Sequence, residues 1–132
     1  MLRALTIRQP WAWAIAAGHK RVENRSWSTA YRGPLAIHAG RVIETEAYAR
    51  CERLAGVGVP FNLATGSVVA VSVLLDVVTH STDPWFEGPY GWVLDVVRPV
   101  VPVPCVGRQS LFNLPHDVED AVREQLRRRA PA

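Results

Sequence analysis

The chain has 132 residues, a mass of 14.6 kDa, 48% hydrophobic and 20% charged residues, and a formal net charge of +3. These values exclude a disordered chain and predict one folded domain over residues 1–132. No apolar run reaches the roughly 20 residues that cross a bilayer, and the N-terminus has no secretory pattern, so we expect a cytoplasmic protein that does not associate with membranes.

The first predicted elements are a short strand and a helix. Residues 3–8 alternate in polarity, which indicates a strand. Pro10 suits the first turn of a helix, where its missing N–H costs nothing. Apolar residues at helical spacing over 11–18 predict a helix that Gly18 ends.

A hairpin is predicted next. Its strands are an extended segment over residues 21–27 and a second strand over 34–38, joined by a turn over 28–33. Apolar spacing then predicts an amphipathic helix over 42–55. The segment GVGVPFNLATG that follows is typical of a loop.

The second half of the chain predicts two strands and a helix. Residues 67–78 are almost continuously apolar and β-branched, which indicates a central buried strand. A further strand is expected over 92–97, and prolines 99, 102 and 104 confine the segment after it to a sheet edge or bulge. A final helix is predicted over about 116–130, with acids early and arginines late as the helix dipole favours. Its inward face is expected to hold Val118, Ala121, Val122 and Leu126.

Together these elements predict the α+β fold class, as a small, partly open β-barrel decorated by helices. Cys51 and Cys105 are expected to be free, buried thiols in a reducing compartment. No cysteine or histidine partner stands at metal-ligand spacing from either of them, so we predict no metal and no cofactor.

Positive charge is concentrated in the first third of the chain. Residues 1–41 carry seven basic side chains and one acidic one, whereas residues 42–132 carry eight basic and eleven acidic ones. Such a patch attracts polyanions, above all nucleic acid. A solvated surface is the alternative, because arginine supplies fourteen of the fifteen cationic residues and Lys20 is the only lysine.

The segment GHKRVENRSW, residues 18–27, holds that lysine and a candidate binding site. On an extended strand Glu23 and Arg25 share a face with Lys20 at the entry, so Glu23 can pair with either cation. Trp11 and Trp27 lie close by in sequence, and aromatic rings beside cations suit a cleft that stacks a base and holds its phosphate. The alternative is a surface ion-pair network of little energetic value, with the tryptophans packed in the core.

Residues near the predicted hairpin turn complete the candidate set. Arg32 can hold a phosphate bidentately or stack on a base. Thr29 and Tyr31 occupy the same turn, where loop residues reach a bound strand. His38 ends the second strand and can hydrogen-bond within a cleft. The predicted nucleic-acid-binding residues are Arg8, Trp11, Lys20, Glu23, Arg25, Trp27, Thr29, Tyr31, Arg32 and His38.

The pattern around Lys20 resembles the ASCH family, which is named for homology to activating signal cointegrator and is grouped with PUA-like folds. The family motif G-x-K-x-x-E-x-R matches Gly18, Lys20, Glu23 and Arg25. The flanking IRQPWAWAIAAG and SWSTAYRGPLAIHAG, and the later GPYGWVLDVVRPV, are also similar to one subgroup, so the resemblance covers about residues 5–115. It implies a PUA-like domain whose partner is nucleic acid or a nucleotide: RNA, DNA or a modified nucleotide.

The resemblance also implies an alternative, enzymatic function. One ASCH branch hydrolyses the acetyl amide of N4-acetylcytidine with a lysine, a threonine and a glutamate. Lys20 matches that lysine, but Glu23 stands where we align the threonine, which removes the hydroxyl nucleophile. In an amidohydrolase of this kind Lys20 and Glu23 would be catalytic, with Glu23 activating water while a cation stabilises the oxyanion. A nuclease is a further alternative, and the sequence leaves open RNA against DNA, single against double strands, and the oligomeric state.

Overall fold

The computed structural model describes residues 1–128, which form a six-stranded sheet and three α-helices. The strands are β1 (Arg3–Gln9), β2 (Val22–Arg25), β3 (Gly33–Ile43), β4 (Ser67–Val78), β5 (Tyr90–Pro104) and β6 (Phe112–Asn113). The helices are α1 (Trp11–Ala16), α2 (Tyr48–Ala55), which follows the 3-10 turn η1 (Thr45–Ala47), and α3 (His116–Arg128). Neighbouring strands follow the order β2-β5-β4-β3-β1-β6.

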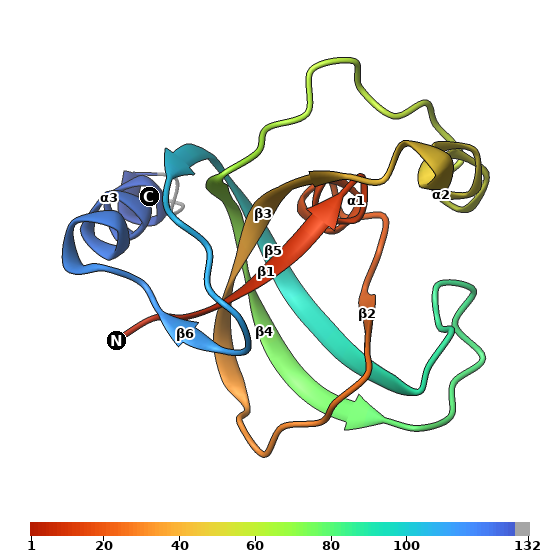
Figure 1. The fold of residues 1–132 in the computed structure, drawn as a ribbon. Coiled ribbons are helices and arrows are strands. Elements are labelled where there is room, and N and C mark those ends of the chain that lie inside the picture. Colours follow the sequence, from red (N-terminus) through yellow and green to blue (C-terminus); the bar gives the residue numbers. More distant parts are fainter. Residues whose placement is uncertain (129–132) are drawn as a thin grey trace.

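The sheet curls into an incomplete barrel (Figure 1). β1 pairs in parallel with β3, and β4, β5 and β2 follow as antiparallel neighbours. In residues 1–128 no backbone pairing joins β1 to β2, so the barrel has an open side between them. A side-chain contact spans this side, because Arg25 of β2 donates from Nη1 to the carbonyl oxygen of Thr6 in β1 at 3.4 Å. The predicted α+β fold and partly open barrel are confirmed.

The predicted hairpin between residues 21–27 and 34–38 is wrong. β2 pairs instead with residues 90–93 of β5, at the far end of the sheet from β1. β3 lies between β1 and β4, and its residues 35–40 are all buried. A strand that is buried on both faces needs long neighbours and covering layers, which the four-residue β2 does not supply.

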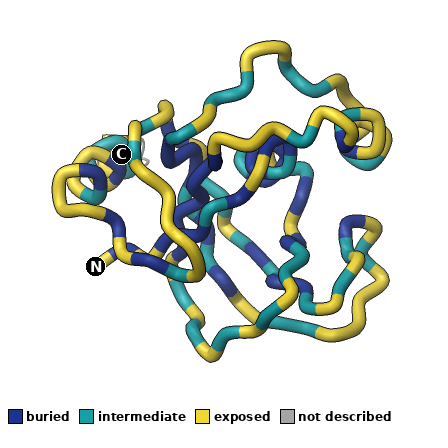
Figure 2. The backbone as a smooth tube through the Cα atoms, in the orientation of Figure 1, coloured by how far each residue is buried: buried dark blue, intermediate teal, exposed yellow. Residues whose placement is uncertain are grey.

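β3 separates two apolar cores. Leu35 and Ile37 pack inside the barrel with Ile15 of α1, whereas Ala36 faces outward and packs with Val118 of α3. Figure 2 shows the buried segments gathered in the strands, with exposed loops around them. α1 therefore packs against the inner face of the sheet, and α3 covers the opposite face.

α3 contacts the sheet through Val118, Val122 and Leu126, which are spaced four residues apart. Ala121 is exposed, contrary to the prediction, because it lies beside this stripe rather than within it. Residues 129 and 130, the end of the predicted helix, lie outside the described residues.

The predicted helix over 42–55 begins later in the structure. Val42 and Ile43 end β3, where Ile43 lies opposite Gln9 of β1 after an irregularity in the pairing. This long-range pairing overrides the helical spacing of the apolar residues, and η1 and α2 follow.

β5 continues through the proline segment to Pro104. Because β2 reaches only residues 90–93, the prolines lie at the sheet edge, as predicted. Gln125 of α3 covers this edge at Val101. Its Nε2 donates to the Val101 carbonyl at 2.9 Å, and its Oε1 accepts the Val101 N–H at 2.7 Å.

Both cysteines are free, but only Cys51 is buried as predicted, and Cys105 is half-buried. None of the helices within residues 1–128 has the length and apolar character that a membrane span requires.

Candidate functional site

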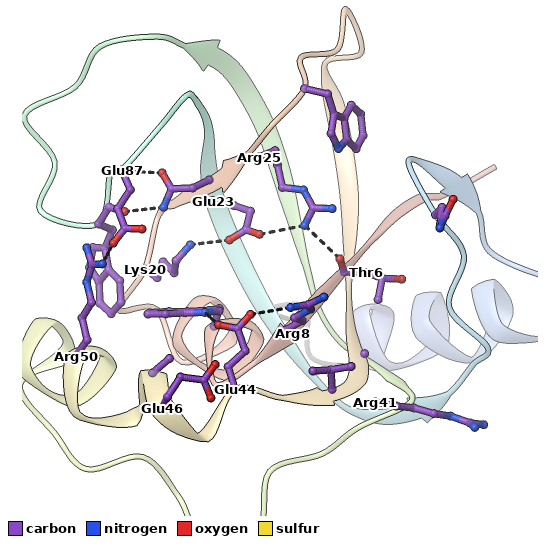
Figure 3. Close-up of a pocket in the computed structure, with 18 of the residues that line it drawn as sticks. Thr6, Arg8, Lys20, Glu23, Arg25, Arg41, Glu44, Glu46, Arg50 and Glu87 are labelled. Atoms are coloured by element: carbon purple, nitrogen blue, oxygen red, sulfur yellow. Dashed lines mark hydrogen bonds and ion pairs between the residues drawn. The ribbon is translucent and has the colours of Figure 1, made fainter.

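A cleft of about 940 Å³ lies on the open side of the barrel, between β1 and β2 (Figure 3). Its walls come from these two strands, the start of α1, the end of β3, η1, one side of α2, and the loops before β5 and after it. The lining residues that matter below are Thr6, Arg8, Trp11, Lys20, Glu23, Asn24, Arg25, Trp27, Arg41, Glu44, Glu46, Arg50, Glu87, Arg108, Gln109 and Ser110.

The junction of β1 and α1 positions Trp11. The buried Gln9 side chain accepts the N–H of Trp13 at 2.8 Å, which satisfies a free donor in the first turn of α1. Trp11 then donates from Nε1 to Glu44 Oε2 at 3.2 Å, and Arg8 donates to Glu44 Oε1 at 3.3 Å. Glu44 therefore holds both side chains at the edge of the cleft.

Lys20 is at the base of the cleft and is only 2% exposed. The chain reverses after α1 at Gly18, whose φ of 86° is a conformation that glycine adopts without strain. Lys20 then donates from Nζ to the Val22 carbonyl at 2.7 Å and to Glu23 Oε1 at 2.6 Å, and Nζ lies 5.7 Å from the centre of the Trp11 ring. Its ammonium group is thus fixed by a carbonyl, a carboxylate and an aromatic face.

Arg25 extends this network toward solvent. Its Nη1 donates to Glu23 Oε2 at 3.3 Å, so the two oxygens of Glu23 bind two different cations. Its guanidinium lies 5.9 Å from the centre of the Trp27 ring. The Trp27 and Trp92 rings pack perpendicular to each other with centres 4.8 Å apart, and Trp27 is partly exposed whereas Trp92 is buried.

The wall beside Lys20 is built by Asn24, Glu87 and Arg50. Asn24 accepts the N–H groups of Glu87 and Gly88 at 2.7 and 3.1 Å and donates to the Trp85 carbonyl at 2.9 Å. This fixes the loop before β5, from which Glu87 forms an ion pair with Arg50 of α2.

The cleft carries an excess of cationic groups. Six cationic side chains line it, against the four carboxylates of Glu23, Glu44, Glu46 and Glu87. Arg8, Lys20, Arg25 and Arg50 each form an ion pair with a carboxylate of the cleft.

Six of the ten predicted site residues line the cleft: Arg8, Trp11, Lys20, Glu23, Arg25 and Trp27. Thr29, Tyr31 and Arg32 lie instead in the crossing from β2 to β3, outside the cleft lining. Arg32 donates to the carbonyls of Thr29 and Tyr31 at 2.7 and 2.8 Å, and Thr29 Oγ1 accepts the Tyr31 N–H at 3.1 Å. These contacts stabilise the crossing, which replaces the tight turn of the predicted hairpin.

His38 is buried behind Thr6 and does not line the cleft. Its Nε2 lies 2.6 Å from the Cys105 carbonyl, to which it must donate, and its Nδ1 lies 3.1 Å from Thr6 Oγ1. Burial lowers the pKa of His38, and the hydrogen bond to Cys105 opposes this shift. His38 therefore acts as a neutral link between β1, β3 and the loop after β5.

The prediction missed the wall formed by Glu44, Glu46 and Arg50, and the end formed by Arg41 and Arg108. These residues are distant in sequence from the motif around Lys20, and folding brings them together. One sequence feature could have identified Arg41 as a site residue, namely its position in the basic first third of the chain.

Comparison with known proteins identifies relatives of this chain. A sequence model described as the ASCH domain matches residues 5–90. Activating signal cointegrator 1 of Homo sapiens is 35% identical over 83 residues, covering 58% of this chain and 14% of that protein. The Mus musculus protein of the same name is 28% identical over 92% of this chain and 24% of its own length. The chain thus spans about a quarter or less of the curated relatives that it matches.

Solved structures share the fold. ASCH from Zymomonas mobilis matches with a TM-score of 0.58 at 17% identity, covering 92% of this chain and 93% of that one. A mutant of the Zymomonas mobilis protein gives a TM-score of 0.60 at 15% identity, with 92% and 96% covered. At these identities the likeness concerns the fold alone. The sequence match over residues 5–90 carries the assignment, and the chain belongs to the ASCH domain family.

Proposed function

We propose that the cleft between β1 and β2 binds an unpaired nucleotide of RNA or DNA, with or without a modified base. The observation that carries this proposal is the network of Lys20, Glu23 and Arg25. Two cations share one carboxylate in it, so the network keeps one positive charge beside the cleft. PUA-like folds are generally linked to RNA binding, which agrees with this choice of ligand.

Arg25 is the group best placed to meet an anion. Its Nη1 serves Glu23 and the Thr6 carbonyl, whereas its Nε and Nη2 donate to no acceptor within the described chain. A guanidinium offers five N–H donors in a planar fork that fits phosphate oxygens. Arg25 is 23% exposed, so a ligand reaches these donors from the cleft.

Trp27 supplies the stacking surface. Its edge-on contact with Trp92 and the Trp92 Nε1 hydrogen bond to the Trp27 carbonyl hold this residue in place. A fixed, partly exposed indole stacks on bases of any sequence at roughly 1–3 kcal/mol per base. The face of a base is accessible to such a ring only when the base is not stacked in a duplex, which favours an unpaired nucleotide.

The geometry favours binding over the amidohydrolase alternative. Lys20 Nζ donates to Glu23 and Val22, so it is held as a donor and not as a base. Both oxygens of Glu23 accept from cations, which leaves the carboxylate poorly placed to activate water. Incubation with N4-acetylcytidine, followed by chromatography, tests this alternative directly, and release of cytidine would restore it.

A titration of labelled single-stranded RNA and DNA at low salt tests the proposal. We expect fluorescence anisotropy to show binding that weakens steeply with added salt and in Arg25→Gln. Arg21→Gln is the matched control, because Arg21 forms an exposed ion pair with Asp95 outside the cleft. Absence of binding to any RNA or DNA strand, or equal losses in the two variants, would contradict the proposal.

A further inference from the structure

We infer that Arg41 and Arg108 form a phosphate subsite at one end of the cleft, which receives a phosphate of the bound nucleotide. This inference rests on the proposed function and adds the position of the phosphate to it.

The ion pairing of the cleft singles out these two arginines. Each of the four other cleft cations has a carboxylate partner. Neither Arg41 nor Arg108 forms an ion pair with any residue between 1 and 128, and both are exposed. Because the rest of the cleft is largely neutralised by its own carboxylates, the attraction for an anion is strongest where these two guanidinium groups lie.

Thr6 lies close to both of the chain segments that carry these arginines. A Cβ atom on Gly40 would lie 2.9 Å from Thr6 Cγ2, and one on Gly107 would lie 2.8 Å from Thr6 Oγ1. The backbones of β3 and of the loop after β5 therefore both approach the Thr6 side chain closely. Arg41 and Arg108 are the next residues along these two segments, and both line the cleft.

The loop that carries Arg108 is fixed before any ligand binds. The Cys105 carbonyl accepts from His38 Nε2 at 2.6 Å, and the Arg108 carbonyl lies 3.3 Å from Thr6 Oγ1, whose single hydroxyl hydrogen it shares with His38 Nδ1. A site whose backbone is already ordered loses less conformational entropy when it binds. Gln109 and Ser110 follow on this loop and add an amide and a hydroxyl donor to the lining.

The chemistry of the site fits phosphate. Guanidinium groups bind phosphate oxygens bidentately, and two of them on neighbouring segments can share one phosphate. Thr6 lies between this end and Arg25, whose Nη1 donates to the Thr6 carbonyl. A nucleotide that stacks on Trp27 therefore has Arg25 beside it and the Arg41–Arg108 pair further along the cleft. Figure 3 shows Arg41 and Arg50 at opposite ends of the view.

The test titrates a single-stranded oligonucleotide with the double variant Arg41→Gln/Arg108→Gln. Two single variants, Arg53→Gln and Arg21→Gln, serve as controls that each remove one positive charge away from the cleft. Arg53 is an exposed arginine of α2 that does not line the cleft and has no ion pair in the described chain. We expect the double variant to weaken binding at least about tenfold and to lower the salt slope by about one for each phosphate that is no longer neutralised. The controls should stay within about twofold of the parent protein, since they remove charge away from the cleft.

A second arm compares oligonucleotides with and without a 5′-phosphate. A loss in the double variant only for the phosphorylated strand identifies a terminal phosphate, and an equal loss for both strands identifies a phosphate within the strand. The subsite is overturned if the double variant binds both strands as tightly as Arg53→Gln does. Failure of the parent protein to bind either strand is a different result, because it removes the proposed function as well.

Discussion

Lys20 and Glu23 form a buried ion pair at the base of the cleft, with Nζ 2.6 Å from Oε1 and side chains 3% and 8% exposed. Charges taken out of water are costly unless each keeps its partners. The sole lysine of the chain is therefore part of the structure that holds Arg25 in place, as well as of the candidate site.

Lys20→Met should strongly destabilise the protein. The methionine keeps an unbranched side chain but leaves Glu23 buried with Arg25 alone, so we expect a loss of about 3–5 kcal/mol in urea unfolding. Lys20→Met/Glu23→Gln should recover part of this loss, because no carboxylate is then left without its partner. Arg21→Gln, which breaks an exposed pair with Asp95, should cost less than about 1 kcal/mol. A Lys20→Met loss no larger than that of Arg21→Gln would contradict the structural role.

Arg25→Lys should weaken nucleic-acid binding although it keeps the charge. Arg25 serves Glu23 and the Thr6 carbonyl from one nitrogen and keeps Nε and Nη2 for a ligand, whereas an ammonium group lacks this fork. We expect a loss of about tenfold in affinity by anisotropy. Arg8→Lys is the comparison, because Arg8 is 63% exposed and makes one long contact with Glu44. Parent-like binding by Arg25→Lys would mean that charge alone matters at this position.

Acid should destabilise the fold through His38. Burial lowers the pKa of His38 below its ordinary value of 6.5. As the pH falls through about 6.5, the unfolded chain binds a proton that the folded chain resists, so stability is complete above this pH and declines below it. The ring contacts Thr6 Oγ1, the Cys105 carbonyl and the Phe112 ring, none of which is a carboxylate that would favour the charged form.

Thermal melts between about pH 7.5 and pH 5 measure this dependence. His38→Gln should flatten the decline relative to the parent protein, whereas His80→Gln should leave it unchanged, since His80 is exposed. Identical slopes in the parent protein and His38→Gln would show that another group sets the acid sensitivity.

Gly107→Ala should destabilise the protein by about 1–3 kcal/mol, because the site is overpacked. The added Cβ would lie 2.8 Å from both His38 Cε1 and Thr6 Oγ1. Gly58→Ala is the control, since the nearest atom to its Cβ would be 3.9 Å away. Chemical denaturation of the two variants gives the comparison, and equal free energies of unfolding would rule out the tight contact at Thr6.

The sequence predicted those parts of the fold whose pattern is local. The opening strand, α1, the buried strand β4 and α3 follow from alternation, helical spacing and a continuous β-branched run. The pairing of β2 with β5 is not local, because nothing within residues 21–38 distinguishes a neighbouring strand from one far along the chain. The same limit explains Val42 and Ile43, whose helical spacing is overridden by the extension of β3 along β1.

The residues of the candidate site also differ in whether a local sequence pattern predicts them. Glu23 and Arg25 lie two residues apart on β2 and Lys20 precedes this strand, so strand alternation already suggested that Glu23 can pair with either cation. Arg41 and Arg108 line the same cleft only because folding brings β3 and the loop after β5 close to Thr6. Thr29, Tyr31 and Arg32 were predicted as binding residues because loop residues in a hairpin turn can reach a bound strand, but that turn does not form and they lie outside the cleft lining.

The contact between Gln125 and Val101 also bears on self-association. An uncovered strand margin offers its N–H and C=O groups as a template on which other chains can add. Here the carboxamide of Gln125 occupies both groups of Val101, and Pro99, Pro102 and Pro104 of the same strand carry no N–H. Helix α3 thus protects β5 from intermolecular β-association in addition to covering a core.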